Sequence, residues 1–314
     1  AAVLDPTDSF ELHVADTLEA GAGLCRRDVV EVVIREGPAL VRSLVKLGAS
    51  FAPADDDSES LDLGLEGGHS RRRIVHSKDR TGQEIESTLL SAVAAHSEIT
   101  LLEHHLALDL WVGPAGGRRR CYGVSFFDQE IGSIGLVRAD QTMLSTGGCG
   151  KVYRYTTNPD IATADGVAMA ARAGCSLGNM EMVQFHPTCL HHAEAKTFLI
   201  SEAVRGEGAV LRNLAGEEFM KGRHPLGSLA PRDVVAREID RETKLRGDKF
   251  VLLDTSGIGE DRFKERFPVI SARLLEYGIV AGRDLIPVVP AAHYMCGGVA
   301  VDLDGRTEID GLFA

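Results

Sequence analysis

Two neighbouring segments decide how the rest of this chain is interpreted: Gln184–Thr188 (Gln-Phe-His-Pro-Thr) and Phe198–Gly208 (Phe-Leu-Ile-Ser-Glu-Ala-Val-Arg-Gly-Glu-Gly). They bring an imidazole, carboxylates, a guanidinium and hydroxyls into a sequence that is otherwise typical of buried structure. Two later segments, Leu229–Arg237 and Pro290–Gly298, add a second histidine and further arginines. A guanidinium matches a carboxylate bidentately and an imidazole adds a directed donor. A single histidine is more often structural than functional, but the four segments together predict a site for a small dicarboxylate.

Composition limits the classes of protein to consider. The chain has 314 residues, 44% hydrophobic and 25% charged, which is ordinary for a globular protein of one or two domains. A net charge of -12 argues against nucleic acid and anionic membrane as partners. No apolar run approaches the roughly 20 residues that a membrane-spanning helix needs. The six cysteines form no Cys-x-x-Cys pair, so we expect a reducing cytoplasm and no metal site.

Hydrophobic spacing predicts mixed helices and strands. We expect two helices between Asp8, as a helix cap, and Gly48, and a further helix over residues 81–96. Strands are predicted over 99–103 and 107–112, followed by a hairpin over 118–135. Further along, Asp165-Gly166 begins an Ala-rich helix that ends before Gly174, and helices are predicted over 231–246 and 260–277 with a strand over 250–254.

One basic segment stands out in this acidic chain. Residues 65–76 read Leu-Glu-Gly-Gly-His-Ser-Arg-Arg-Arg-Ile-Val-His. A run of charge is usually a solvated face, whereas arginines beside a double glycine also suit an anion site. Gly67-Gly68 would let the backbone carry Glu66 close to a ligand.

Several motifs resemble the succinate dehydrogenase and fumarate reductase flavoprotein family. They are Gln-Phe-His-Pro-Thr, Glu-Ala-x-Arg-Gly-Glu-Gly, Ala-Pro-Arg-Asp-Val-Val and His-Tyr-x-Cys-Gly-Gly-Val, with Asn-Pro-Asp-Ile before Asp165. Within that family, Glu66–Ile74 and Pro290–Tyr294 are similar to the L-aspartate oxidase branch. The similarity extends over nearly the whole chain, and it corresponds to the central portion of such proteins.

The resemblance implies an α/β fold: part of a FAD-binding Rossmann-like domain with an inserted α+β capping domain. Residues 1–178 would belong to the FAD-binding domain, residues 179–295 to the capping domain, and residues 296–314 to the return into the FAD-binding domain. The family's Gly-x-Gly-x-x-Gly turn, which holds the FAD pyrophosphate at a helix N-terminus, does not occur in this sequence. We therefore expect the chain alone to bind FAD weakly or not at all, and whether it is active by itself stays open.

The resemblance also implies an activity. It is the FAD-dependent oxidation of L-aspartate to iminoaspartate, with oxygen or fumarate as acceptor, in NAD biosynthesis and upstream of quinolinate synthase. The implied substrate-binding residues are His186, Ser201, Glu202, Arg232, His293 and Glu66, of which Arg232, His186, His293 and Glu66 are the catalytic candidates. The implied FAD-binding residues are Ala107, Thr146, Gly147 and Asp165.

Three alternatives stay open. The chain could be a succinate dehydrogenase or fumarate reductase flavoprotein subunit, or a folded segment without cofactor and catalysis. Arg232 could serve only as the partner of Asp233 or Glu202, and Glu202 could pair with Arg205, three residues away on one helix face. Asp165 could be no more than a helix cap.

Overall fold

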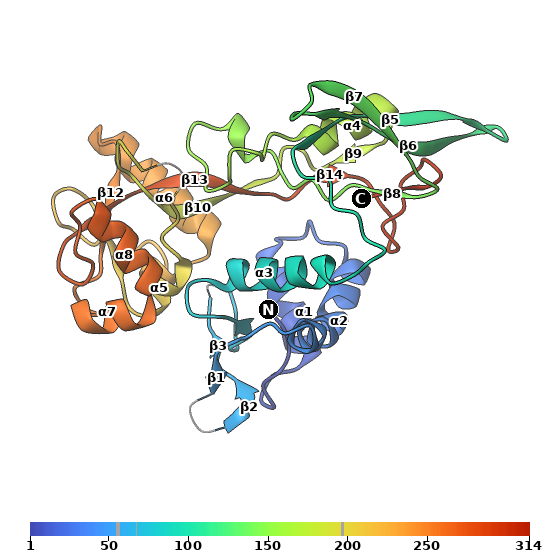
Figure 1. Cartoon of the computed structure of the whole chain (residues 1–314). Helices are drawn as coiled ribbons and strands as arrows, with labels where there is room; N and C mark the ends of the chain where they lie inside the picture. Colours follow the sequence, from blue (N-terminus) through green and yellow to red (C-terminus); the bar gives the residue numbers. More distant parts are fainter. Residues whose placement is uncertain (55–56, 67, 196–197) are drawn as a thin grey trace. The chain divides into compact units, whose positions relative to one another are not determined.

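The computed structural model describes residues 1–54, 57–66, 68–195 and 198–314. They form two compact units, each built from separate stretches of chain (Figure 1). Unit 1 comprises Ala1–Ile99 and Pro187–Pro290, and unit 2 comprises Thr100–His186 and Ala291–Ala314. Residues 1–99 thus group with residues 187–290. The division at residues 178 and 295 into FAD-binding and capping domains stays a prediction.

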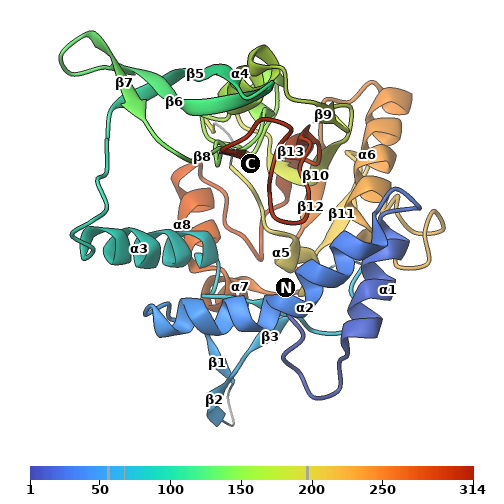
Figure 2. The ribbon, with the colours of Figure 1, turned by 90° about the vertical axis from the view of Figure 1, so that its right-hand side faces the viewer.

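Unit 1 is mainly helical. Its helices are α1 (Phe10–Ala20), α2 (Arg27–Lys46), α3 (Thr81–Ala94), α5 (Glu202–Gly206), α6 (Arg232–Arg246), α7 (Glu260–Arg266) and α8 (Pro268–Glu276), with a 3-10 turn η2 (Gly227–Leu229). Its strands are β1 (Pro53–Ala54), β2 (Asp57–Leu61), β3 (Leu63–Gly64), β4 (Ile74–Val75), β11 (Val210–Arg212) and β12 (Val251–Asp254). Figure 2 shows α7 and α8 joined end to end and α1 beside α2.

Unit 2 is built around an antiparallel sheet in the order β5-β6-β7, with α4 packed on β5. Its elements are β5 (His105–Ala115), β6 (Arg118–Asp128), β7 (Ser133–Arg138), β8 (Thr142–Met143), η1 (Gly150–Val152), α4 (Asp165–Ala173), β9 (Leu177–Gly178), β14 (Gly298–Val299) and β15 (Leu312–Phe313). Strands β8 and β15 are parallel. The predicted hairpin over 118–135 corresponds to β6 and β7.

Two strands continue along the chain from one unit into the other, β10 (Val183–Leu190) and β13 (Ile286–Met295). They are neighbours in a four-stranded sheet of order β10-β13-β12-β11. Most residues of both strands are buried or half-buried, because the strands lie in a core and not on a face exposed to solvent. His186 lies on β10 and His293 on β13.

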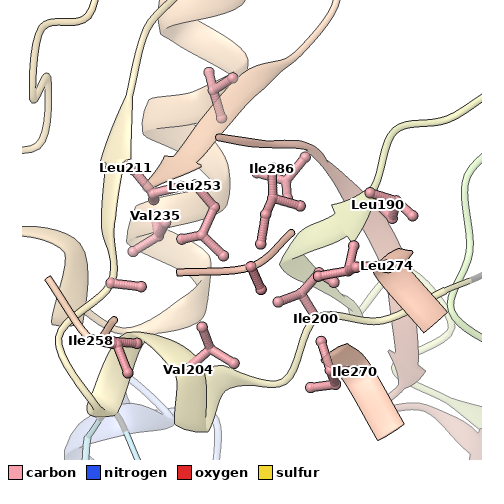
Figure 3. Packing of buried hydrophobic residues seen from close by; sticks show 14 of the residues in the cluster. Leu190, Ile200, Val204, Leu211, Val235, Leu253, Ile258, Ile270, Leu274 and Ile286 are labelled. Carbon is pink, nitrogen blue, oxygen red and sulfur yellow. The ribbon is translucent and has the colours of Figure 1, made fainter. Parts of the chain in front are cut away.

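The larger hydrophobic core lies in unit 1 (Figure 3). Leu211, Leu253 and Ile286 from the sheet meet Ile239 of α6 and Leu274 of α8, all without measurable exposure. Each such side chain contributes roughly 1.5–3 kcal/mol by leaving water. This core holds α5 and the beginning of α6 in place, and these two helices carry the acidic and basic residues of interest.

Several sequence predictions need correction. Ser9, not Asp8, caps α1, because its hydroxyl accepts from the Leu12 amide while the Asp8 carboxylate binds Arg73. Residues 99–103 form no strand. The helix expected over 260–277 is broken between α7 and α8, where Phe267 leaves the helical conformation just before Pro268, as residues preceding proline do. The helices over 81–94, 165–173 and 232–246 are confirmed.

The basic segment is divided in the structure: Arg71 and Arg72 are exposed, as expected for a solvated run of charge, whereas Arg73 is buried. Arg73 is neither solvated nor part of an exposed anion site, since its side chain is fully buried between the carboxylates of Asp8 and Asp16. Gly67 of the double glycine lies outside the described residues, and Gly68 has a φ of 84°.

Candidate functional site

Arg232 is the centre of an ion-pair cluster in unit 1. It is the first residue of α6, following Pro231, whose extended conformation directs the chain into the helix. Its Nε donates to Oε2 of Glu202, and its Nη2 lies 3.2 Å from Oε2 of Glu66. The Arg232 side chain keeps 21% of its surface exposed and Glu66 28%, so both remain within reach of a small ligand.

Glu202 links this cluster to a fully buried arginine. Oε1 of Glu202 lies 3.1 Å from Nη2 of Arg205, whose Nη1 donates to the Ser228 carbonyl at 2.6 Å. Burial lowers the pKa of Arg205, an effect that the neighbouring Glu202 carboxylate opposes. Both pairs that the sequence left open, Arg232 with Glu202 and Glu202 with Arg205, are therefore present.

The other proposed partner of Arg232 is engaged elsewhere. The Asp233 carboxylate accepts from Nη2 of Arg237 at 2.7 Å, one turn further along α6. Such exposed pairs contribute little to stability. The structure pairs Arg232 with glutamates from other segments of the chain. Such pairing across the fold distinguishes this cluster from an exposed ion pair within a single helix.

Glu66 differs from an ordinary surface carboxylate. Burial raises its pKa and the nearby Glu202 adds to this rise, while the charge of Arg232 opposes it. A half-buried carboxylate whose ionised form is disfavoured gains from the arrival of a cation, because the cation replaces the lost solvation. Ser201 lies next to the cluster as the cap of α5, with Oγ accepting from the Ala203 amide at 3.3 Å.

The two histidines of interest lie together in unit 2. The rings of His186 and His293 are 5.1 Å apart and nearly perpendicular, and His186 is 1% exposed. Nδ1 of His293 lies 2.6 Å from the Thr157 hydroxyl, and the Asn158 side chain donates to the His293 carbonyl at 2.8 Å. The segment around Thr157 therefore fixes both the backbone and the ring of His293.

The candidate cofactor residues also lie in unit 2. After β8 the chain enters an exposed turn containing Thr146 and Gly147, the latter with a φ of 69°. A Cβ atom at Gly166 would lie 1.8 Å from the Thr146 hydroxyl, so this turn touches the beginning of α4 next to Asp165. Asp165 accepts from the Thr163 hydroxyl at 2.8 Å.

This arrangement fits a dinucleotide. The exposed turn follows the carboxyl end of a parallel strand, where open α/β sheets bind ligands, and it meets a helix N-terminus that favours anions. The contact at Gly166 leaves no room for a side chain, so backbone and hydroxyl groups are presented closely there. Ala107, on β5, packs against the core of unit 2 and is only partly buried. Thr146 and Gly147 are thus brought to the beginning of α4 and Asp165, and Ala107 lies on β5.

The described part of the chain shows neither a cluster of metal-binding side chains nor a membrane-spanning helix. In residues 1–54, 57–66, 68–195 and 198–314, His, Cys, Asp and Glu side chains form no group of three suited to a metal ion. Among the same residues, no helix has both the length and the apolar character to cross a membrane.

Comparison with known proteins defines the class. The model of the FAD-binding domain family matches residues 1–314, and the chain belongs to this family. FAD is therefore the cofactor indicated, and the predicted α/β fold of a FAD-binding flavoprotein is confirmed.

Similar individual proteins point to one branch. L-Aspartate oxidase 1 of Ralstonia nicotianae is 51% identical over all of this chain and 59% of its own length. The L-aspartate oxidase of Yersinia pestis is 47% identical over all of this chain and 60% of its length. Among solved structures, a quinol fumarate reductase of E. coli is 33% identical with a TM-score of 0.91, covering all of this chain and 55% of that chain. The chain thus spans about half to three fifths of the length of the curated relatives that it matches.

Sequence reasoning missed three features of these groups. It did not find Arg205 as a fully buried residue, Thr157 as the partner of His293, or Asp8 and Asp16 as partners of Arg73. Thr157 stands in the segment Thr-Thr-Asn-Pro, whose hydroxyls and amide were a usable signal. Asp16 and Asp8 lie 57 and 65 positions before Arg73 in the chain, so no local sequence signal marks these two pairs.

Proposed function

We propose that this chain contributes substrate and cofactor contacts to a FAD-dependent enzyme that oxidises L-aspartate to iminoaspartate. The observation that carries this proposal is the pairing of a half-buried carboxylate, Glu66, with a guanidinium, Arg232, at 3.2 Å. L-Aspartate offers an ammonium group and two carboxylates, so it needs both kinds of partner. The similarity to L-aspartate oxidases over the whole chain supports the same substrate.

Arg232 and Glu66 have complementary proposed roles. The guanidinium, oriented by Glu202, binds a substrate carboxylate, which suits its planar donor fork better than a lysine would. Glu66 accepts from the substrate ammonium, because the raised pKa caused by its burial makes a cationic partner favourable. Arg232 stays a cation at ordinary pH, so we assign it binding and orientation and not proton abstraction.

Roles for the remaining residues follow from their chemistry. His186, His293 and Ser201 donate to the dicarboxylate, and Glu202 holds Arg232. Positioning of this kind is worth roughly 7–11 kcal/mol of the barrier when the reacting atoms are well aligned. Thr146, Gly147 and Asp165 hold FAD with Ala107.

The oxidation is balanced by the cofactor. Thr146, Gly147 and Asp165 would hold FAD, which would supply the two-electron acceptor for the hydride from C2 of aspartate, while the substrate nitrogen would lose a proton to give the C=N bond of iminoaspartate. The protein's residues hold both carboxylates and the amine so that the C2–H bond has one orientation. Oxygen or fumarate as final acceptor, quinolinate synthase as the next enzyme, NAD biosynthesis as the process and the cytoplasm as location belong to the same proposal.

The test compares two substrates that differ by the amine. The protein in its full-length form is loaded with FAD, oxygen is removed, and the bleaching of flavin absorbance is followed after adding L-aspartate or succinate. We expect L-aspartate to bleach the flavin much faster than succinate. Glu66→Gln should weaken L-aspartate by about 1.5–3 kcal/mol, the usual worth of a charged hydrogen bond, and leave fumarate reduction unchanged. Glu98→Gln, an exposed glutamate of unit 1, is the matched control.

A second candidate is succinate oxidation or fumarate reduction without use of the amine. The likeness to the quinol fumarate reductase of E. coli favours it. Rapid bleaching by succinate, together with equal losses on both substrates in Glu66→Gln, would support this candidate. No bleaching by either substrate after FAD loading would support a non-catalytic segment.

A further inference from the structure

The loop that carries Glu66 connects two short paired strands. Its described residues are 65, 66 and 68–73, between β3 and β4, where Gly64 pairs with Ile74. The Arg73 amide donates to the Gly64 carbonyl at 3.0 Å and closes the base of the loop. Two paired residues on each side are too few to fix such a loop by themselves, so its conformation depends on contacts to other elements.

The main contact is to one carboxylate oxygen on α1. Oδ2 of Asp16 accepts from the Ser70 amide at 2.8 Å, from the Ser70 hydroxyl at 2.8 Å and from Nη1 of Arg73 at 2.5 Å. These bonds join the middle of the loop, its end and α1 at a single point. Hydrogen bonds to an ionised acceptor are about twice as strong as neutral ones.

Asp8 provides a contrast within the same cluster. Its two oxygens accept from Nε and Nη2 of Arg73 at 2.7 and 2.9 Å, and both side chains are fully buried. Among the described residues, the Asp8 carboxylate is bonded to Arg73 and not to Ser70. Removing its charge therefore weakens the buried ion pair, whereas removing that of Asp16 also releases the loop.

The path from Ser70 to Glu66 is short. The amide of His69 donates to the Glu66 carbonyl at 3.2 Å, and Ser70 follows directly. The His69 ring packs against His13 of α1, with ring centres 6.0 Å apart. The His69–Glu66 bond thus links the backbone next to Ser70 to the Glu66 backbone, while the Glu66 carboxylate is paired with Arg232.

We propose that Asp16 is a positioning residue for Glu66, and that its attachment of the 65–73 loop to α1 decides whether the site discriminates an amino dicarboxylate from the same dicarboxylate without an amine. The inference rests on the proposed function of Glu66. A loosened loop leaves the charge of Glu66 present but misplaced, and a displacement of about 1 Å is enough to lose most of a directed contact. Ligands that lack the ammonium group do not use this contact.

The test measures binding by calorimetry for L-aspartate and succinate in the full-length protein, loaded with FAD that is reduced beforehand and kept free of oxygen so that neither ligand is oxidised. Asp16→Asn should weaken L-aspartate by about tenfold and succinate by less than about twofold, because only the amine contact is lost. Asp8→Asn is the matched control. It should lower the midpoint of thermal unfolding yet keep the ratio of the two affinities. A purely structural role of Asp16 would move the midpoint and leave the ratio unchanged.

A milder variant keeps the test decisive if Asp16→Asn fails to fold. Ser70→Ala removes only the hydroxyl donor and should shift the affinity ratio in the same direction by about twofold to fivefold, the effect of one hydrogen bond. The proposal is overturned if the folded Asp16 or Ser70 variant weakens both ligands equally, or if Asp8→Asn changes the ratio as much. Glu66→Gln distinguishes failure of this inference from failure of the proposed function. If that variant leaves the ratio of the L-aspartate and succinate affinities unchanged, the proposed function itself is refuted.

Discussion

The histidine on α1 makes the stability of this protein dependent on pH. His13 is 7% exposed and lies beside the buried guanidinium of Arg73. Burial first, and then the charge of Arg73, lower the pKa of His13 from 6.5 to about 4. The unfolded chain therefore takes up a proton at a higher pH than the folded one. The resulting stability is present above about pH 6.5 and is lost as the pH falls toward 4.

The size of the effect follows from the width of this window. It spans about 2.5 pH units, and each unit is worth about 1.4 kcal/mol, so the free energy of unfolding should fall by about 3 kcal/mol between pH 7 and pH 4 through His13 alone. Asp8 and Asp16 act in a separate window. The hydrogen bonds from Arg73 lower the pKa of Asp8 below its usual 3.8. For Asp16, the hydrogen bonds from Ser70 and Arg73 lower the pKa below 3.8 although burial acts to raise it. Protonation of these two carboxylates therefore destabilises the fold only at more acidic pH.

Urea unfolding at several pH values between 7 and 4 measures this. His13→Gln should flatten the dependence of the unfolding free energy on pH by about 3 kcal/mol over that range. His96→Gln, an exposed histidine of the same unit, is the control and should follow the parent. If His13→Gln and the parent show the same pH dependence, the buried environment of His13 does not suppress its protonation and the reasoning is wrong.

Three further predictions concern binding and turnover. Arg232→Lys should lower turnover of L-aspartate by about a hundredfold or more, since lysine loses the planar fork; steady-state rates within about threefold of the parent would contradict a substrate-binding role. Gly166→Ala should weaken the affinity for FAD by at least about tenfold in a fluorescence titration, because its Cβ would lie 1.8 Å from the Thr146 hydroxyl in the turn proposed to hold FAD. Gly178→Ala is the control: open space surrounds this glycine, so the affinity for FAD should not change. Thr157→Val should weaken succinate binding and change the tautomer of His293, which proton–nitrogen NMR detects. Thr157→Ser keeps the hydroxyl and should restore both properties. If the tautomer of His293 is unchanged in Thr157→Val, the 2.6 Å contact does not orient the ring.

Local signals in the sequence predicted the elements that depend on neighbours along the chain. The helix of residues 165–173 has apolar residues at helical spacing and a glycine in the left-handed conformation just after it, and both features act within one turn. The break at Phe267 was missed although Pro268 marks it, because apolar spacing continues across the break. The strand expected over 99–103 was wrong because a short apolar run does not determine whether a partner strand is available.

The candidate site divides in the same way. The residue types of a dicarboxylate site, and the pairing of Glu202 with Arg205 three residues away, could be predicted from the sequence, since charge, donor geometry and helix periodicity are properties of the residues themselves. For Arg232, the sequence offered Glu202 and Asp233 as partners without deciding between them, and it did not indicate Glu66; the partners of Arg73 could not be predicted at all. Glu66 lies 166 positions from Arg232, and Asp16 lies 57 positions from Arg73.

The sequence by itself therefore determined the chemistry that this protein can offer: a guanidinium, carboxylates and imidazoles in segments that form α5, α6, β10 and β13. Apart from the local pair of Glu202 and Arg205, tertiary structure decided which of these groups meet. Packing of the unit 1 core brings the beginning of α6 beside α5 and beside the loop after β3, and burial there raises the pKa of Glu66. The pKa of a side chain and the strength of an ion pair depend on how far solvent is excluded and on distances between groups across the fold. A short stretch of sequence determines neither the burial nor these distances.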